Sequence, residues 1–192
     1  MLKLLTPAHV IFLGVIISAI GGVWASYQQK TSAEVNAALN REIKESITGG
    51  DSFCYLTVTQ LKNPNDVGLL LVNNAGKYPL YDLSMRMANL DDVEQLASRE
   101  HNSLDVLKLG TSFTLGNLSA GLATSLGTIP LPRQKQLRFN VFFYARNGSF
   151  TELLRLKNVD GIWRQAIRVT PEFKPEQVIF EKIDPEYGEP NW

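Results

Sequence analysis

The sequence predicts a mainly β protein, in which an N-terminal transmembrane helix and a helical stalk precede an antiparallel β-sandwich of the immunoglobulin-like type. Three observations lead to this class. Residues 8–27 contain no Asp, Glu, Lys or Arg. Many short segments of alternating apolar and polar residues follow, and tight-turn pairs interrupt residues 137–170. The expected parts are an anchor at 1–27, a stalk at 28–50, a β domain at 51–183 and a flexible tail at 184–192.

Composition excludes several classes of function. The chain has 192 residues, with 19 basic and 19 acidic side chains. This balance leaves no whole-chain field that would attract nucleic acid, so nucleic-acid binding is not expected. Cys54 is the single cysteine, which excludes an intramolecular disulfide and a cysteine-rich zinc site.

The apolar segment is long enough to cross a bilayer. Twenty helical residues span about 30 Å, the thickness of the hydrocarbon core. Thr6-Pro7 is a typical helix start, and Trp24 and Tyr27 suit the far interface. The lipid bilayer is therefore the first expected partner. A cleaved signal peptide, with a small-residue site at residues 23–25 and a secreted domain, is the alternative.

The flanking charges leave the orientation open. Lys30, Arg41 and Lys44 follow the apolar segment and would favour a cytoplasmic domain by count. A very short N-terminal tail with Lys3 more commonly stays inside the cell. We expect the second arrangement, which places the domain in the periplasm or elsewhere outside the cytoplasm.

Residues 28–47 keep helical chemistry, because they contain neither Pro nor Gly. Their apolar residues recur every fourth position, at Val35, Leu39, Ile43 and Ile47. We expect the anchor helix to continue here as a lone stalk or as a helix lying on the domain. A coiled-coil dimer is the weaker alternative, since no heptad is sustained. Gly49-Gly50 should end the helix.

Alternation predicts several strands in the β domain. Cys54 is expected to pack in the core with Leu56 and Val58, and a reactive thiol is the less favoured interpretation. A short helix is expected within 89–101, and loops with an edge strand toward residue 132. The predicted strands lie at 52–61, 67–73, 80–88, 104–107, 112–115 and 177–182. In the strand at 80–88, the side chains expected on the core side are Tyr81, Leu83, Met85 and Met87.

A three-stranded meander is expected at 137–170, with two-residue turns at Asn147-Gly148 and Asp160-Gly161. The first turn would place Val141 opposite Leu154, and the second would place Leu154 opposite Ile167.

The same register puts a basic row on the other face of the meander, with Arg138 opposite Lys157 and Lys157 opposite Arg164. Like charges in opposition are unfavourable, so either acidic neighbours neutralise the row or it binds an anion of a lipid, glycan or nucleic acid. Phe142 and Tyr144, on the same face, are expected to stack on a ligand or to pack beneath a loop. The candidate anion-binding residues are Arg138, Arg155, Lys157, Arg164 and Arg168.

No catalytic, cofactor or metal constellation is found. The two histidines, His9 and His101, lie in the anchor and in a polar loop. A hydrolase would need carboxylates such as Asp51, Asp82 and Glu152 to converge in a cleft. Glu152 falls on the apolar face of the meander, where we expect it to escape to the rim.

The segment Thr48-Gly49-Gly50-Asp51-Ser52-Phe53-Cys54-Tyr55, placed after an anchor and a stalk, resembles uncharacterised bacterial membrane-anchored proteins. This resemblance implies membrane anchoring and carries no known activity. The expected function is that of a single-pass membrane-anchored binding or scaffold module with a protein partner. An anionic-surface binder and a membrane-anchored hydrolase are the alternatives.

Overall fold

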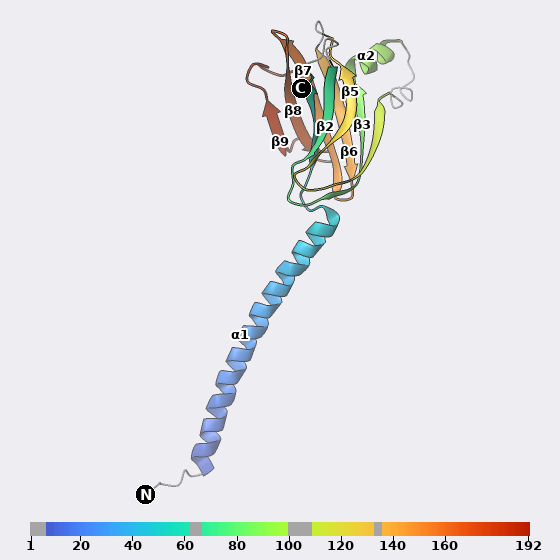
Figure 1. The fold of residues 1–192 in the computed structure, drawn as a ribbon. Helices are drawn as coiled ribbons and strands as arrows, with labels where there is room; N and C mark the ends of the chain where they lie inside the picture. The colour runs from blue at the N-terminus through green and yellow to red at the C-terminus, as the bar shows by residue number, and fades with distance from the viewer. Residues whose placement is uncertain (1–6, 62–66, 100–108, 133–135) are drawn as a thin grey trace. The chain divides into compact units, whose positions relative to one another are not determined.

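The computed structural model describes residues 7–61, 67–99, 109–132 and 136–192 (Figure 1). The chain divides into two compact units, Met1–Lys44 and Glu45–Trp192. The first unit is helical, and every described strand belongs to the second. The predicted turn at 63–66, the predicted strand at 104–107, Thr6 and His101 lie outside the described residues.

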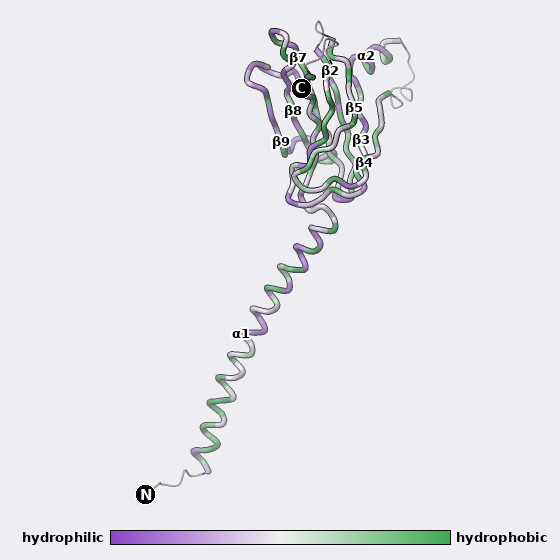
Figure 2. The backbone as a smooth tube through the Cα atoms, in the orientation of Figure 1, coloured by the Kyte–Doolittle hydropathy of each residue, from purple (hydrophilic) through white to green (hydrophobic). Residues whose placement is uncertain are grey.

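One helix, α1 (Pro7–Thr48), runs without interruption through the predicted anchor and stalk. No residue of α1 is buried. Figure 2 shows a continuous hydrophobic segment in its N-terminal half and a mixed segment in its C-terminal half. Within the described residues, this is the one helix long and apolar enough to cross a membrane. Gly49 and Gly50 end it with φ angles of 99° and 54°, as predicted, because glycine accepts the left-handed conformation.

The second unit contains two sheets whose strands all pair in antiparallel fashion (Figure 1). The three-stranded sheet has the order β1-β2-β5, and the six-stranded sheet has the order β4-β3-β6-β7-β8-β9. A short helix, α2 (Leu90–Arg99), directly follows β3. The strands are β1 (Cys54–Gln60), β2 (Val67–Asn74), β3 (Leu80–Asn89), β4 (Thr111–Leu118), β5 (Ala123–Pro130), β6 (Leu137–Ala145), β7 (Gly148–Val159), β8 (Ile162–Pro171) and β9 (Phe180–Ile183).

Both sheets contribute to one hydrophobic cluster. Leu56 and Val72 of the three-stranded sheet and Phe143, Leu154 and Ile167 of the six-stranded sheet are almost completely inaccessible to solvent. The predicted long helix and antiparallel β region are therefore confirmed, whereas the sandwich and its immunoglobulin type stay predictions.

The second hairpin of the meander has the predicted register. Asp160-Gly161 forms its two-residue turn between Val159 and Ile162, and Leu154 lies opposite Ile167. Asp160 itself adopts a φ of 51°, as a tight turn of this kind requires.

The register of the first hairpin was predicted wrongly. Ala145 pairs with Gly148, so the turn residues are Arg146 and Asn147, and Val141 lies opposite Glu152 instead of Leu154. The side-chain amide of Asn147 donates to the carbonyl oxygens of Gly50 (3.1 Å) and Ser52 (2.6 Å). These long-range bonds fit the observed turn and are invisible to local turn preference. A shift of two residues leaves every side chain on its predicted face.

One further prediction, the core position of Tyr81, needs correction. Tyr81 does not join the core, because the β3–β4 register shifts between Leu80 and Leu83 and Asp82 has a φ of 54°. Because of this irregularity, Leu80 and Leu83 are both buried, and Tyr81 between them is only partly buried. The edge strand expected toward residue 132 is β5, which pairs with β2 at the edge of the smaller sheet.

Candidate binding groove on the six-stranded sheet

The C-terminal segment covers the outer face of β7 and β8. Arg155 is only 3% exposed, and its guanidinium donates to the carbonyl oxygens of Phe139 (2.7 Å), Leu154 (3.1 Å) and Asn191 (3.1 Å). Tyr187 is buried. The prediction of a flexible tail at 184–192 is therefore wrong, because the buried guanidinium takes one of its acceptors from the chain end.

Charged partners accompany most of the predicted basic row. Arg138 contacts Asp91 and Glu94 of α2 at 2.6 and 2.7 Å, and it lies opposite Arg155 instead of Lys157. The hydrogen bonds that Arg138 donates to Glu94 and Asp91 raise the pKa of Arg138 further above its ordinary value. Arg164 lies 3.3 Å from Glu186, and Arg168 lies 2.7 Å from Glu181.

Lys157 does lie opposite Arg164, as predicted. Arg168 also places its guanidinium carbon 4.2 Å from the centroid of the Trp192 ring, a cation–π contact. Acidic and aromatic groups from α2, β9 and the C-terminal segment thus contact Arg138, Arg164 and Arg168 of the row. Binding of an external anion by these five residues stays a prediction.

The other half of this outer face, over β3 and β6, contains a groove. Ala88 of β3 and Phe142 and Tyr144 of β6 line it, and Tyr144 is 43% exposed. Alternation brings these residues to the face opposite the core, since Met85, Met87, Val141 and Phe143 point inward.

Helix α2 and Leu109 also line the groove. Leu90 and Val93 are the contributions of α2, which the ion pairs of Arg138 hold against β6. Arg86 donates from Nε and Nη2 to the carbonyl oxygen of Leu109 at 3.2 and 2.5 Å. These hydrogen bonds hold Leu109 in place, and its side chain forms part of the apolar lining of the groove.

Polar groups accompany the apolar lining. Arg86, Asn140 and Glu172 line the groove together with its aromatic and aliphatic side chains. An apolar surface with a few polar groups is typical of ligand and peptide sites. This groove, here called the β3–β6 groove, suits an apolar or aromatic side chain of a partner. The alternation of Phe142 and Tyr144 was visible in the sequence, but the contribution of α2 was not.

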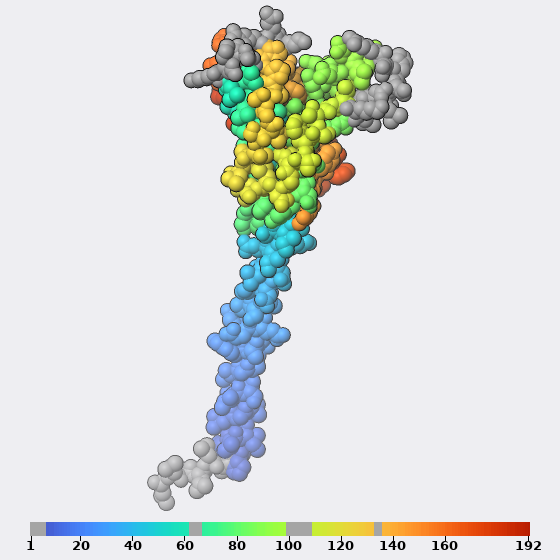
Figure 3. Space-filling model, turned by 45° about the vertical axis from the view of Figure 1, so that its right-hand side comes forward, coloured from blue at the N-terminus to red at the C-terminus, as the bar shows by residue number. Residues whose placement is uncertain are grey.

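A second hollow lies between β5 and the start of α2 (Figure 3). Ile129 and Pro130 line one side, and Asn89 and Asp92 line the other. This hollow contains no aromatic side chain except Phe139. Its lining offers no arrangement of groups that would act in catalysis.

Glu152 lies in the core and not at the rim, which corrects the prediction. It is fully buried, and its Oε2 accepts a 2.6 Å hydrogen bond from the backbone N–H of Leu56. Burial raises the pKa of the Glu152 carboxyl well above its ordinary value. Alternation had already placed this residue on the apolar face, so the signal was present in the sequence.

Glu152 is one of the side chains that accept hydrogen bonds from backbone N–H groups at the edge of β1. Gln165 accepts from the N–H of Val58 at 3.1 Å, and Gln60 accepts from the N–H of Trp163 at 3.1 Å. The N–H groups of Leu56 and Val58 point away from β2, so Glu152 and Gln165 of the larger sheet take the place of a neighbouring strand, while Gln60 of β1 bonds back to β8. Glu152 therefore has a structural partner and no substrate-facing position.

The groups required for hydrolysis do not converge. Asp51 and Asp82 are exposed, and Asp82 pairs with Arg146 at 2.9 Å. Burial also raises the pKa of Cys54, which keeps it a neutral thiol. Within the described ranges, no group of three or more His, Cys, Asp or Glu side chains could hold a metal ion.

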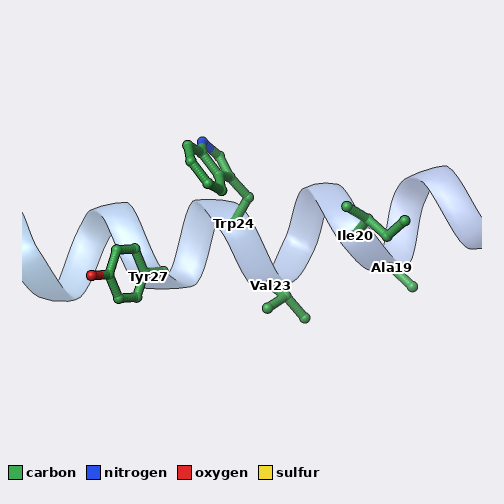
Figure 4. Close-up of a pocket in the computed structure, with 5 residues that line it drawn as sticks. All are labelled: Ala19, Ile20, Val23, Trp24 and Tyr27. Carbon is green, nitrogen blue, oxygen red and sulfur yellow. The ribbon is translucent and has the colours of Figure 1, made fainter.

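A shallow surface lies along α1 itself, beside Ala19, Ile20, Val23, Trp24 and Tyr27. Figure 4 shows these side chains projecting from a single helix without any opposing element. The lining is almost wholly apolar and suits lipid chains better than a polar substrate.

No protein-family model, no curated protein and no solved structure matches this chain. Geometry and chemistry therefore carry the functional conclusion.

Proposed function

We propose that this chain is a single-pass membrane protein that displays a binding or scaffold domain, a β-sandwich of the immunoglobulin-like type. One observation carries the proposal. The apolar half of α1 is a regular helix whose side chains are all exposed, and no other described element covers it. Ile11, Val15 and Ile20, for example, are 62–68% exposed. Burying these side chains in lipid removes a large apolar surface from water.

Alkaline carbonate extraction of membranes tests the anchoring. Wild-type protein is expected in the pellet, and the Ile16→Lys/Ile20→Lys variant in the supernatant. Each lysine near the centre of a spanning helix costs about 2.5–3.5 kcal/mol on insertion scales. Ala33→Lys/Ala37→Lys, in the stalk, is the matched control and should stay in the pellet. Extraction of the wild-type protein would disprove the anchor, and a mass that lacks the first 25 residues would support the cleaved signal peptide instead.

We place the domain outside the cytoplasm, because a very short N-terminal tail ahead of an anchor commonly stays inside the cell. Fusing alkaline phosphatase or a fluorescent protein to the C-terminus distinguishes the two sides, since the first folds only in an oxidising compartment. Phosphatase activity without fluorescence is expected. The reverse result would place the domain in the cytoplasm.

The β3–β6 groove is the proposed binding surface of the domain. Its exposed Tyr144 and the adjacent aliphatic side chains support this role. The fluorescent probe 8-anilinonaphthalene-1-sulfonate should bind the groove, because its aromatic body suits the apolar and aromatic lining. Tyr144→Ser should weaken this binding several-fold. Ile162→Ser, at the similarly exposed first residue of β8 and outside the groove, should leave it unchanged. Equal binding by both variants would contradict the assignment.

A further inference from the structure

The stalk half of α1 carries a row of exposed apolar side chains. Val35, Leu39, Ile43 and Ile47 are 52%, 52%, 56% and 56% exposed. Residues four apart lie on one side of a helix, and the structure shows that the helix is continuous through all four. An exposed apolar row outside the apolar segment marks an interaction surface.

The charges of the stalk avoid this row. Successive residues of an α-helix are about 100° apart, so the charged residues of 28–48 fall within an arc of about 160°. The rest of the circumference contains no charge and includes the apolar row together with Ser32, Asn36 and Asn40. We name this side the uncharged face. The charged residues outside it are Lys30, Glu34, Arg41, Glu42, Lys44 and Glu45.

Opposite charges border the uncharged face on its two sides. Glu42 lies at one border and Lys44 at the other. In a parallel, two-fold symmetric pair of helices, the Glu42 border of the uncharged face on one helix meets the Lys44 border on the other helix. Glu42 of one copy would therefore lie near Lys44 of the other, in both halves of the pair. Asn36 lies near the centre of the face, where a buried asparagine favours one register and a dimer.

The same direction continues into the apolar half of α1. Because the helix is unbroken, angular positions in the stalk carry through to the apolar segment. Between residues 14 and 26, the large side chains Ile16, Ile20 and Val23 point the opposite way. The residues aligned with the uncharged face are Gly14, Val15, Ile17, Ser18, Gly21, Gly22 and Ala25, of which the small ones lie toward its centre and Val15 and Ile17 toward its two borders. Small residues let two helices approach closely in lipid, and the space beside each of these glycines is open.

We propose that α1 pairs in parallel with α1 of a second copy of this chain, through the uncharged face of the stalk and the small residues aligned with it. A second copy fits because the border charges match under two-fold symmetry. This inference rests on the proposed membrane anchoring, since insertion gives both helices the same direction.

Cysteine crosslinking of the full chain in membranes tests the pairing. Asn36→Cys lies in the uncharged face, and Ala38→Cys, about 160° away on the helix, is the matched control. Cys54 is buried and can be retained. Under mild oxidation, Asn36→Cys should give several-fold more dimer of twice the chain mass than Ala38→Cys. Adding Ile43→Lys to Asn36→Cys should remove the crosslink, whereas adding Ala38→Lys should preserve it.

Three results would overturn the pairing. These are equal crosslinking at both positions, no crosslink at Asn36→Cys, and a crosslinked product whose mass shows a different partner chain. Carbonate extraction of the same membranes separates the two proposals. Protein absent from the pellet disproves the anchor, whereas protein in the pellet without position-dependent crosslinking disproves the pairing alone.

Discussion

The hydroxyl of Tyr78 donates a 2.9 Å hydrogen bond to Oε2 of Glu45, which joins the last turn of α1 to the turn before β3. Both residues belong to the unit Glu45–Trp192. The Tyr78 ring also lies against Gly50, where an added Cβ would come within 2.6 Å of Cδ2. The N–H of Tyr78 donates to Oγ of the buried Ser52 at 2.9 Å. The residues that follow the helix are therefore packed as part of the β domain.

Replacing Tyr78 by Phe keeps the ring and removes the hydroxyl. The expected loss in the free energy of unfolding is about 1 kcal/mol, typical for one hydrogen bond. Urea unfolding of the full-length chain in mild detergent measures it. A double-mutant cycle with Glu45→Gln should show coupling between the two residues. Additive losses would mean that the hydrogen bond contributes nothing.

Replacing Gly50 by Ala should destabilise the domain by about 1–3 kcal/mol through backbone strain, and further through the contact with Tyr78. Gly121→Ala is the control, because Gly121 has a similar φ of 66° and no atom within 4 Å of its added Cβ. The Gly50 variant should therefore lose more thermal stability. Equal losses would show that the Tyr78 ring moves aside without cost.

The buried Glu152 should make stability depend on pH. Its pKa is raised in the folded state, so between the ordinary value of 4.5 and the folded value the native protein binds more protons than the unfolded chain. The stabilising contribution of Glu152 to the free energy of unfolding is fully present below pH 4.5 and is lost as the pH rises through the pKa of Glu152 in the folded protein. Cys54 beside it adds no titration in this range, because burial raises the pKa of its thiol as well.

Glu152→Gln removes the titrating group and keeps an oxygen that can accept from Leu56. Urea unfolding from about pH 5 to about pH 8 should show stability falling with pH in the wild type and a weaker fall in this variant. Parallel pH profiles of the two proteins would mean that Glu152 does not titrate differently in the folded and unfolded states.

The packed C-terminal segment should contribute to stability. Tyr187 is 6% exposed, and truncating a buried aromatic side chain to alanine typically costs about 3–5 kcal/mol. We expect the loss for Tyr187→Ala to lie toward the lower end of this range, since Tyr187 is buried outside the core cluster. Phe173→Ala is the control, because Phe173 is 87% exposed and should be nearly neutral. Indistinguishable unfolding midpoints would mean that the segment is not held against the sheet.

Short-range pattern was enough to predict the elements that depend on neighbours in the chain. The absence of charge from 8–27 and of Pro and Gly from 28–47 predicted one helix, and Gly49-Gly50 predicted its end. Alternation predicted which faces of β1, β6 and β8 are buried, because the period of a strand is a local property. The Asp160-Gly161 turn was also predicted correctly, and a local hydrogen bond from the Gly161 N–H to Asn158 supports it.

Tertiary structure decided what depends on partners distant in sequence. Asn147 donates hydrogen bonds to Gly50 and Ser52 and belongs to the shifted turn. Glu152 accepts from the N–H of Leu56, which no strand pairs. Arg155 donates to the carbonyl oxygen of Asn191. Each of these polar groups is wholly or partly buried and must find a partner wherever the fold supplies one. Periodicity can show that such a group is buried, but only the packed structure shows which distant group satisfies it.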